Sequence, residues 1–177
     1  MKGAFGTYAR SQNGYTLVEV VIASAIGAIL MSALTSVVLT SMRAANIATS
    51  RIEASGQIRN FESYAYDDFA GSVIPDPSTC AAPPAACSIV LSGTRVSNSI
   101  TPTAAPYTVT YSWNGTSGSP LDRAFGGTSR HVATSVAAFS WYVDGSAPYR
   151  TVIVSLTVKV QDYSESQTLR FFPRVNP

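Results

Sequence analysis

Hydrophobic and polar positions divide this chain into a helical first part and a strand-rich second part. Residues 20–42 carry no charge, and an apolar run of this length can span a hydrocarbon core as a helix. No proline interrupts residues 15–69, so the sequence predicts one continuous helix over this range. The first half of this helix is apolar on all sides, as expected where lipid or other helices surround it.

The second half of the predicted helix is amphipathic. Its apolar residues recur at spacings of three or four and form one stripe: Ala54, Ile58, Phe61, Ala65 and Phe69. Arg51, Arg59 and Glu62 lie off this stripe, and the apolar face that remains must be covered by another layer. Gly71, followed by Pro75, indicates where the helix ends.

Beyond residue 87 the hydrophobic period changes from that of a helix to that of a strand. Three segments carry apolar residues at every second position: 107–113, 139–143 and 151–160. Residues 167–172 would return beside the third segment, and Asp144 with Gly145 signals a turn after the second. Short links between consecutive strands imply an antiparallel meander, one face of which covers the helix. The predicted fold class is therefore α+β.

Composition argues against several classes of function. Charged residues make up 12% of the chain and the formal net charge is +2. No basic cluster accompanies a row of aromatic residues, so nucleic-acid binding is not expected. No nucleophile–base pair, phosphate-binding loop or paired-carboxylate site stands out, so neither an enzyme nor a cofactor is predicted. The single histidine, His131, lies in a Ser/Thr-rich stretch and is interpreted as a surface residue.

Two groups of residues beyond the apolar stripe could carry chemistry. Asp67, Asp68 and Asp76 could suggest calcium, but their spacing matches no calcium-binding loop, so they are interpreted as a solvated helix end. Cys80 and Cys87 enclose the segment AAPPAA. A disulfide between them would stabilise the loop by about 2–3 kcal/mol, and free thiols are the alternative. A metal site would need further ligands, and none is near in the sequence.

A short basic leader precedes the apolar run, and Gly14 is the only plausible processing site. A secretory signal peptide has a shorter apolar region and a cleavage site after it. Cleavage after Gly14 would instead leave the hydrophobic helix as the N-terminus of the mature protein. Glu19 then places one carboxylate near the head of this helix, where an apolar surrounding makes a charge costly.

The segment GYTLVEVVIA, from Gly14 to Ala23, resembles the class III signal of type IV pilins and pseudopilins. The resemblance implies that a prepilin peptidase cleaves after Gly14 and that Tyr15 is N-methylated. It also implies that Glu19 serves subunit assembly by pairing with the N-terminal amine of a neighbouring subunit. The alternative is that Glu19 only complements its own helix start, by about 0.3–1 kcal/mol. Two features depart from the family pattern: Tyr15 replaces the usual Phe, and the first proline is Pro75.

The resemblance further implies an organisation in segments. These are a leader, a transmembrane and assembly helix, an amphipathic helix, a Pro/Cys-rich loop and a sheet region, at residues 1–14, 15–42, 43–71, 72–87 and 88–177, with 43–177 as one globular domain. The chain would cross the bacterial inner membrane once, with its globular domain in the periplasm or outside the cell. The expected partners are other pilin or pseudopilin subunits, prepilin peptidase, the inner-membrane assembly machinery and, before assembly, membrane lipid.

Within the family, the strand-rich region is similar to J-type pseudopilins and to minor pilins at filament tips. The similar segments are YTVTY at 107–111, LDR at 121–123 and VAAFSW at 136–141. The predicted function is that of a structural subunit, a minor pilin or pseudopilin, in a type IV pilus or a type II secretion pseudopilus. The alternatives are a major pilin of a surface fibre for adhesion or motility, and a membrane-anchored binding domain that never assembles.

Overall fold

The computed structural model describes residues 14–75, 80, 85–96, 104–145 and 150–173. The predicted leader therefore lies outside the described residues except for Gly14, and so do residues 76–79 and 81–84 of the predicted loop. The chain divides into two compact units, Met1–Ala45 and Asn46–Pro177.

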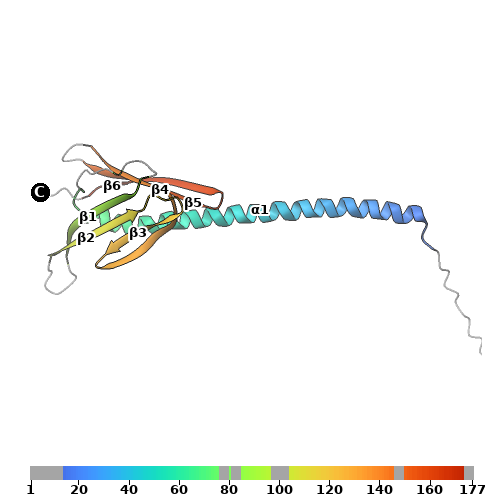
Figure 1. The fold of residues 1–177 in the computed structure, drawn as a ribbon, viewed down its shortest axis with the longest axis horizontal. Coiled ribbons are helices and arrows are strands. Elements are labelled where there is room, and N and C mark those ends of the chain that lie inside the picture. The colour runs from blue at the N-terminus through green and yellow to red at the C-terminus, as the bar shows by residue number, and fades with distance from the viewer. Residues whose placement is uncertain (1–13, 76–79, 81–84, 97–103, 146–149, 174–177) are drawn as a thin grey trace, which may run out of the picture. The chain divides into compact units, whose positions relative to one another are not determined.

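The predicted long helix is confirmed as α1, which runs without a break from Leu17 to Ala70 (Figure 1). It begins two residues later than predicted because Thr16 caps its first turn. The helix ends before Gly71, the residue that the sequence analysis named as its stop signal, and the N–H of Gly71 donates to the carbonyl of Asp67.

Six strands form one antiparallel sheet in which each strand pairs with the next along the chain (Figure 1). Their bounds are β1 Cys87–Val96, β2 Ala104–Trp113, β3 Ser119–Phe125, β4 Thr128–Asp144, β5 Thr151–Val160 and β6 Tyr163–Phe171. The predicted meander and the α+β fold class are therefore confirmed. Val109, Tyr111 and Trp113 of β2 are buried, as their alternation predicts.

The strands β1 and β3 and the first part of β4 were not predicted. β3 carries Asp122 and Arg123 in its centre, so its sequence lacks a clear alternation of apolar residues. β4 is 17 residues long and pairs with β3 over residues 128–136 and with β5 over 136–144. Only its second half, around the predicted segment 139–143, has the apolar alternation of a half-buried strand.

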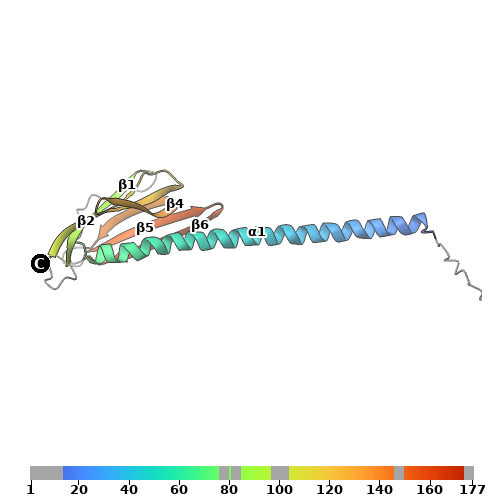
Figure 2. The same cartoon turned by 90° about the horizontal axis from the view of Figure 1, so that it is seen from below.

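The second half of α1 packs on one face of the sheet (Figure 2). The predicted stripe is confirmed, because the apolar helix residues buried in the core are Ala54, Ile58, Phe61, Ala65 and Phe69. Phe61 meets Tyr111 edge-on with ring centroids 5.6 Å apart, and Phe69 stacks on Phe171 of β6 at 4.2 Å. Aromatic pairs of this kind contribute about 0.5–1.5 kcal/mol each beyond the area they bury.

Polar side chains on both flanks of α1 fix the sheet relative to this half of the helix. On one flank, Gln57 Oε1 accepts hydrogen bonds from the backbone N–H groups of Thr134 and Ser135 over 2.9 and 3.0 Å. Thr134 and Ser135 have no paired residue in either neighbouring strand, so the helix supplies the acceptor that the sheet does not provide at this point. On the other flank, Gln167 of β6 donates to Glu62 Oε1 over 2.7 Å.

Gly93 of β1 lies directly against the end of α1. A Cβ atom at Gly93 would overlap the carbonyl oxygen of Gly71 and would come within 2.9 Å of the Tyr107 ring. Gly56, in contrast, lies in the exposed face of α1, and a Cβ atom added there would meet nothing within 4 Å. Gly93 is therefore required by the close approach of two backbone segments, whereas Gly56 is not required by any contact in the structure.

We expect Gly93→Ala to destabilise the domain by about 1–3 kcal/mol, because overpacking forces the helix end and β1 apart. Gly56→Ala is the matched control and should stabilise by about 0.5–1 kcal/mol, since alanine has the higher helix propensity. Urea unfolding of the full chain in detergent micelles, followed by tryptophan fluorescence, measures both changes. Similar unfolding midpoints for the two variants would contradict the close approach at Gly93.

Candidate functional site

Thr16 caps the N-terminus of α1 and defines the first turn, which contains Glu19. The backbone N–H of Glu19 donates to the side-chain Oγ1 and to the carbonyl oxygen of Thr16, over 3.3 and 3.0 Å. Thr16 and Glu19 have the spacing of a capping box, in which Glu follows a capping Thr by three residues. The sequence analysis missed this cap, although the Thr-x-x-Glu spacing was the signal that could have found it.

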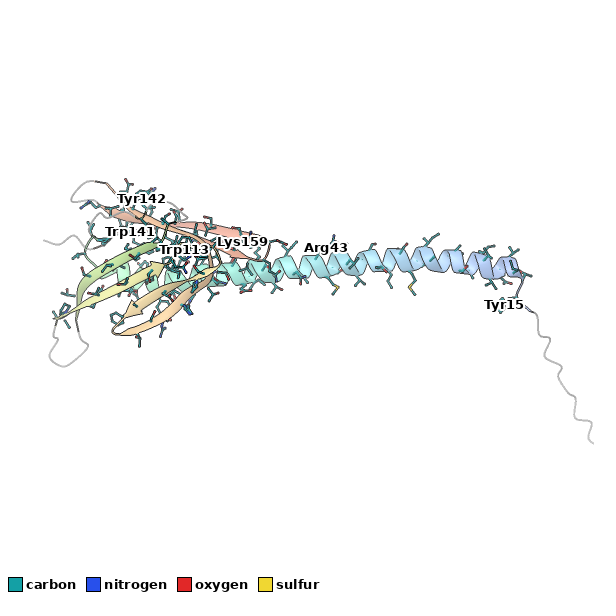
Figure 3. All side chains as sticks on the ribbon, in the orientation of Figure 1. Tyr15, Arg43, Trp113, Trp141, Tyr142 and Lys159 are labelled. Carbon is teal, nitrogen blue, oxygen red and sulfur yellow. A yellow bond between two sulfur atoms is a disulfide. The ribbon has the colours of Figure 1, made fainter. Side chains whose placement is uncertain are left out.

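The residues predicted to serve processing and assembly lie together at this accessible helix end. A Cβ atom added to Gly14 would meet nothing within 4 Å. Tyr15 is 82% exposed and stands at the start of α1 (Figure 3), and Glu19 is exposed in the first turn. Their geometry leaves Gly14, Tyr15 and Glu19 open to partners, and the roles assigned to them stay predictions.

The first half of α1 presents apolar side chains on every side. The large side chains between Leu17 and Met42 are exposed, and α1 is long and apolar enough to cross a membrane, judged by length and composition. A continuous apolar surface of this kind marks contact with a membrane or with another protein. These properties fit a membrane-anchored, single-pass protein with an exposed globular domain.

Five hydroxyl side chains within this apolar segment bond to carbonyl groups of their own helix. They are Ser24, Ser32, Thr35, Ser36 and Thr40, and their donor–acceptor distances are 2.8–2.9 Å. Each hydroxyl therefore has its hydrogen-bond partner within the helix. An apolar surrounding then leaves none of these five donors unpaired, which matters because unpaired polar groups are costly there.

A buried polar cluster joins the last turn of α1 to the sheet. Arg123 of β3 donates from Nε and Nη2 to the two carboxylate oxygens of Asp68, over 2.6 and 2.8 Å. The hydroxyl of Tyr111 of β2 donates to Asp68 Oδ2 over 2.6 Å, and Asp68 is only 1% exposed. Tyr111 and Arg123 are paired in the β2–β3 register, so two neighbouring strands direct their donors to one carboxylate.

Burial and hydrogen bonding hold the donors of this cluster in fixed protonation states. Burial raises the pKa of Tyr111 well above its usual value, and the hydrogen bond to Asp68 and the charge of Asp68 raise it further. The hydrogen bonds to Asp68 also raise the pKa of Arg123. Tyr111 therefore stays neutral and Arg123 stays charged at neutral pH, so both remain donors to Asp68.

Aromatic rings cover the guanidinium of Arg123 on two sides. The Arg123 Cζ atom lies 5.3 Å from the ring centroid of Tyr64 and 5.2 Å from that of Phe125, which are cation–π distances. A second guanidinium, that of Arg130, lies 5.3 Å from the Tyr64 ring, and its Nη1 donates to the Tyr64 hydroxyl over 2.6 Å. The rings limit the access of water to the ion pair, which strengthens it.

The interpretation of Asp67, Asp68 and Asp76 as a solvated helix end is wrong for Asp68. Asp68 follows Ala65 by three residues and so falls on the buried face of α1, where Arg123 supplies its counter-charge. Asp67 is exposed, and Asp76 lies outside the described residues. No group of three His, Cys, Asp or Glu residues in the described part of the chain could hold a metal ion.

Cys80 and Cys87 are joined by a disulfide in the structure, with their Cα atoms 5.3 Å apart. Because Cys87 is the first residue of β1, this bond ties the connection after α1 to the start of the sheet. The effect of the bond on stability stays a prediction.

His131 is exposed, as the sequence analysis expected, and its Nδ1 lies 2.5 Å from Asp122 Oδ1.

Residues 9–35 match the family model described as the prokaryotic N-terminal methylation motif. No curated protein and no solved structure matches the chain. The matched stretch contains Gly14, Tyr15 and Glu19 together with the first turns of α1. This motif supports a type IV pilin-like family for the chain, and the fold agrees, because a long N-terminal helix packed on an antiparallel sheet is a type IV pilin-like arrangement. Proteins of this class are structural subunits, which are processed by a prepilin peptidase and assemble with other pilin subunits.

We expect Asp68→Ala to destabilise the domain by about 3–5 kcal/mol, because it leaves the partly buried Arg123 without its counter-charge. Asp67→Ala is the matched control: it removes a carboxylate from the adjacent exposed position and should change stability by no more than about 0.5 kcal/mol. Urea unfolding of the full chain in detergent micelles, followed by near-UV circular dichroism, measures both. Equal small effects would show that the ion pair contributes little to stability.

Proposed function

We propose that this chain is a structural subunit, a minor pilin or pseudopilin, of a type IV pilus or a type II secretion pseudopilus. In this proposal a prepilin peptidase cleaves after Gly14 and Tyr15 is N-methylated. The protein is held in the bacterial inner membrane by residues 15–42, with its globular domain in the periplasm or outside the cell, until it is assembled. The observation that carries the proposal is an exposed carboxylate, that of Glu19, in the first turn of an exposed apolar helix inside a methylation motif.

The carboxylate of Glu19 needs a counter-charge once apolar groups surround the helix. Cleavage after Gly14 creates an amine on Tyr15, and methylation of an amine keeps its charge. In an assembly of parallel helices, this amine can meet Glu19 of a neighbouring subunit. Removing one member of a buried ion pair costs about 3–5 kcal/mol, so the pair would set the axial position at which subunits join.

The cap at Thr16 supports an intermolecular role for Glu19. Thr16 Oγ1 already accepts a hydrogen bond from the N–H of Glu19, so one of the unpaired donors of the first turn is satisfied without the Glu19 carboxylate. The carboxylate itself is exposed and can meet a group outside its own helix.

The hydroxyl side chains of the apolar segment suit both surroundings that the proposal requires. Ser24, Ser32 and Thr35 bond to carbonyls of their own helix, so transfer from lipid to a filament core breaks none of these bonds. A minor subunit is favoured over a major one because the apolar half of α1 contains no proline, whereas many members of the family that the chain resembles have one midway along this helix.

The first test of this proposal concerns processing. We expect the mature protein to begin at Tyr15 with a methylated amine, which intact-mass analysis of membrane-extracted protein measures. Gly14→Val should block removal of the leader, and the open space around Gly14 means that the fold itself accepts the larger residue. Gly27→Ala, at another glycine with open surroundings, is the control that should leave processing unchanged. A mature N-terminus at Met1 would contradict the proposal.

The second test concerns assembly. We expect Glu19→Ala to leave membrane insertion and cleavage intact but to reduce cross-linking to other pilin subunits strongly, because the Tyr15 amine then loses its counter-charge in an apolar core. Glu19→Gln keeps the shape of the side chain and a hydrogen-bond acceptor but removes the negative charge, so it tests whether the charge itself is needed. Glu53→Ala removes another exposed carboxylate of α1 and is the control.

Unchanged cross-linking in both Glu19 variants would return this residue to a local role at the helix start. Correct processing combined with an absence of cross-links in the unsubstituted protein would favour a membrane-anchored domain that does not assemble. Surface fibres composed mostly of this chain would favour a major pilin.

A further inference from the structure

An open groove of about 460 Å³ lies between α1 and β6 in the globular unit. Its lining comes from the exposed flank of α1 and from the end of β6: Arg59, Glu62, Ser63, Tyr66, Leu169, Arg170 and Phe171. A smaller hollow of about 110 Å³ continues from it and adds Ala70 and Phe172. Tyr66 is 70% exposed and Phe172 is 72% exposed, so two large aromatic side chains border a hollow that no described part of the chain fills.

The two edges of the sheet differ in how far they are covered. At β1, the N–H of Val73 donates to the carbonyl of Ser92 over 2.8 Å, and Ser72 forms a bridge with Gly93. At β6, the described residues provide a strand neighbour on one side only, namely β5. The outward backbone groups of β6 are therefore available to a further strand, and they lie beside the groove.

The exposed flank of α1 continues the surface on which β6 already rests. Ser55 Oγ donates to Glu165 Oε2 over 2.6 Å, and Gln167 donates to Glu62 over 2.7 Å, so α1 and β6 run side by side (Figure 2). Successive helix residues are 100° apart around the axis. By this rotation, the residues that follow Ser55 and Glu62 around the helix, on the side away from the core, are Tyr66, Arg59, Ala70 and Ser63. A strand added beside β6 would rest on these four residues.

The charge of the groove selects among possible strands. Arg59 and Arg170 are exposed, and neither has an ion-pair partner among the residues that the structure describes. The groove's acidic side chain, that of Glu62, already accepts a hydrogen bond from Gln167. An incoming segment with carboxylates would thus meet two free guanidinium groups, whereas a basic segment would be repelled.

We propose that β6 and the adjacent flank of α1 form a docking site for an extended acidic segment of another protein, which adds to the sheet as a seventh strand. The backbone of the segment pairs with the open edge of β6, which is the β-augmentation mode of peptide recognition. Arg59 and Arg170 bind its carboxylates, and Tyr66 and Phe172 contact its apolar side chains. The site does not depend on Gly14, Tyr15 or Glu19, so it stands apart from the assembly role proposed above.

The test measures binding of a fluorescent peptide of about eight residues, in which pairs of valines alternate with pairs of aspartates so that each face of the strand carries both, to the full chain in detergent micelles. We expect saturable binding, about ten-fold weaker for the same peptide with lysine in place of aspartate. The double reversal Arg59→Glu with Arg170→Glu should invert this preference. The control, Arg51→Glu with Lys159→Glu, changes the net charge equally at exposed positions outside the groove and should keep it.

Backbone pairing is tested with two N-methylated forms of the acidic peptide, each blocking one alternate set of amides. We expect one form to lose binding and the other to keep it, because a strand at an edge donates only every second N–H to its neighbour. Hydrogen exchange should slow in β6 and not in β1 when the peptide is bound.

Equal binding of the two methylated peptides, or of the aspartate and lysine peptides, would overturn the proposal. So would protection of β6 that rises with the concentration of the chain alone, because the occupant would then be a second copy. These outcomes leave the processing and cross-linking tests of the filament proposal unaffected.

Discussion

An unbroken helix that carries two different apolar surfaces is the constraint on which the rest of the molecule depends. The first half of α1 is apolar on all sides and its large side chains are exposed, whereas the second half has one apolar stripe that the sheet covers. Because α1 is helical from Leu17 to Ala70, both surfaces belong to one element, and each must be covered in its own way. The first half must be covered by lipid or by other helices, and its internally bonded hydroxyls and its cap at Thr16 are consistent with both.

The second half of α1 is held on the sheet by polar side chains at several positions along the helix. Gln57 accepts two backbone hydrogen bonds at the point where β4 changes partner, and Asp68 brings Tyr111 and Arg123 to the last turn. The apolar stripe packs in the core but tolerates small shifts along the helix, since dispersion contacts are weakly directional. The charged hydrogen bonds at Asp68 have strict geometry, and we infer that they fix which turn of α1 meets β2 and β3.

Features with a strong period could be predicted from the sequence, and features that depend on partners distant in the sequence could not. The helix, the stripe from Ala54 to Phe69 and the alternation of β2 and β5 follow from local spacing and were predicted. Asp68 was misinterpreted because a carboxylate near a helix end is usually solvated, and its counter-charge lies 55 residues away. The same ion pair explains why β3 was missed, because Arg123 occupies an inward position where alternation leads one to expect an apolar residue.

The ends of the meander follow from the same arrangement of α1 and the sheet. A six-stranded antiparallel sheet has two edge strands, and here the segment that leaves α1 turns back at Ser72 and Val73 to cover part of β1. The chain has no comparable described segment at β6, whose neighbour across the groove is the flank of α1 itself. Natural sheets usually protect an open edge with inward charges, prolines or a covering element, because a bare edge recruits other strands. The backbone of β6 lacks such a cover among the described residues, and guanidinium groups and aromatic rings border it. In the docking proposal, the two guanidinium groups repel basic strands and attract acidic ones. The open edge of β6 would therefore pair with some strands and not with others.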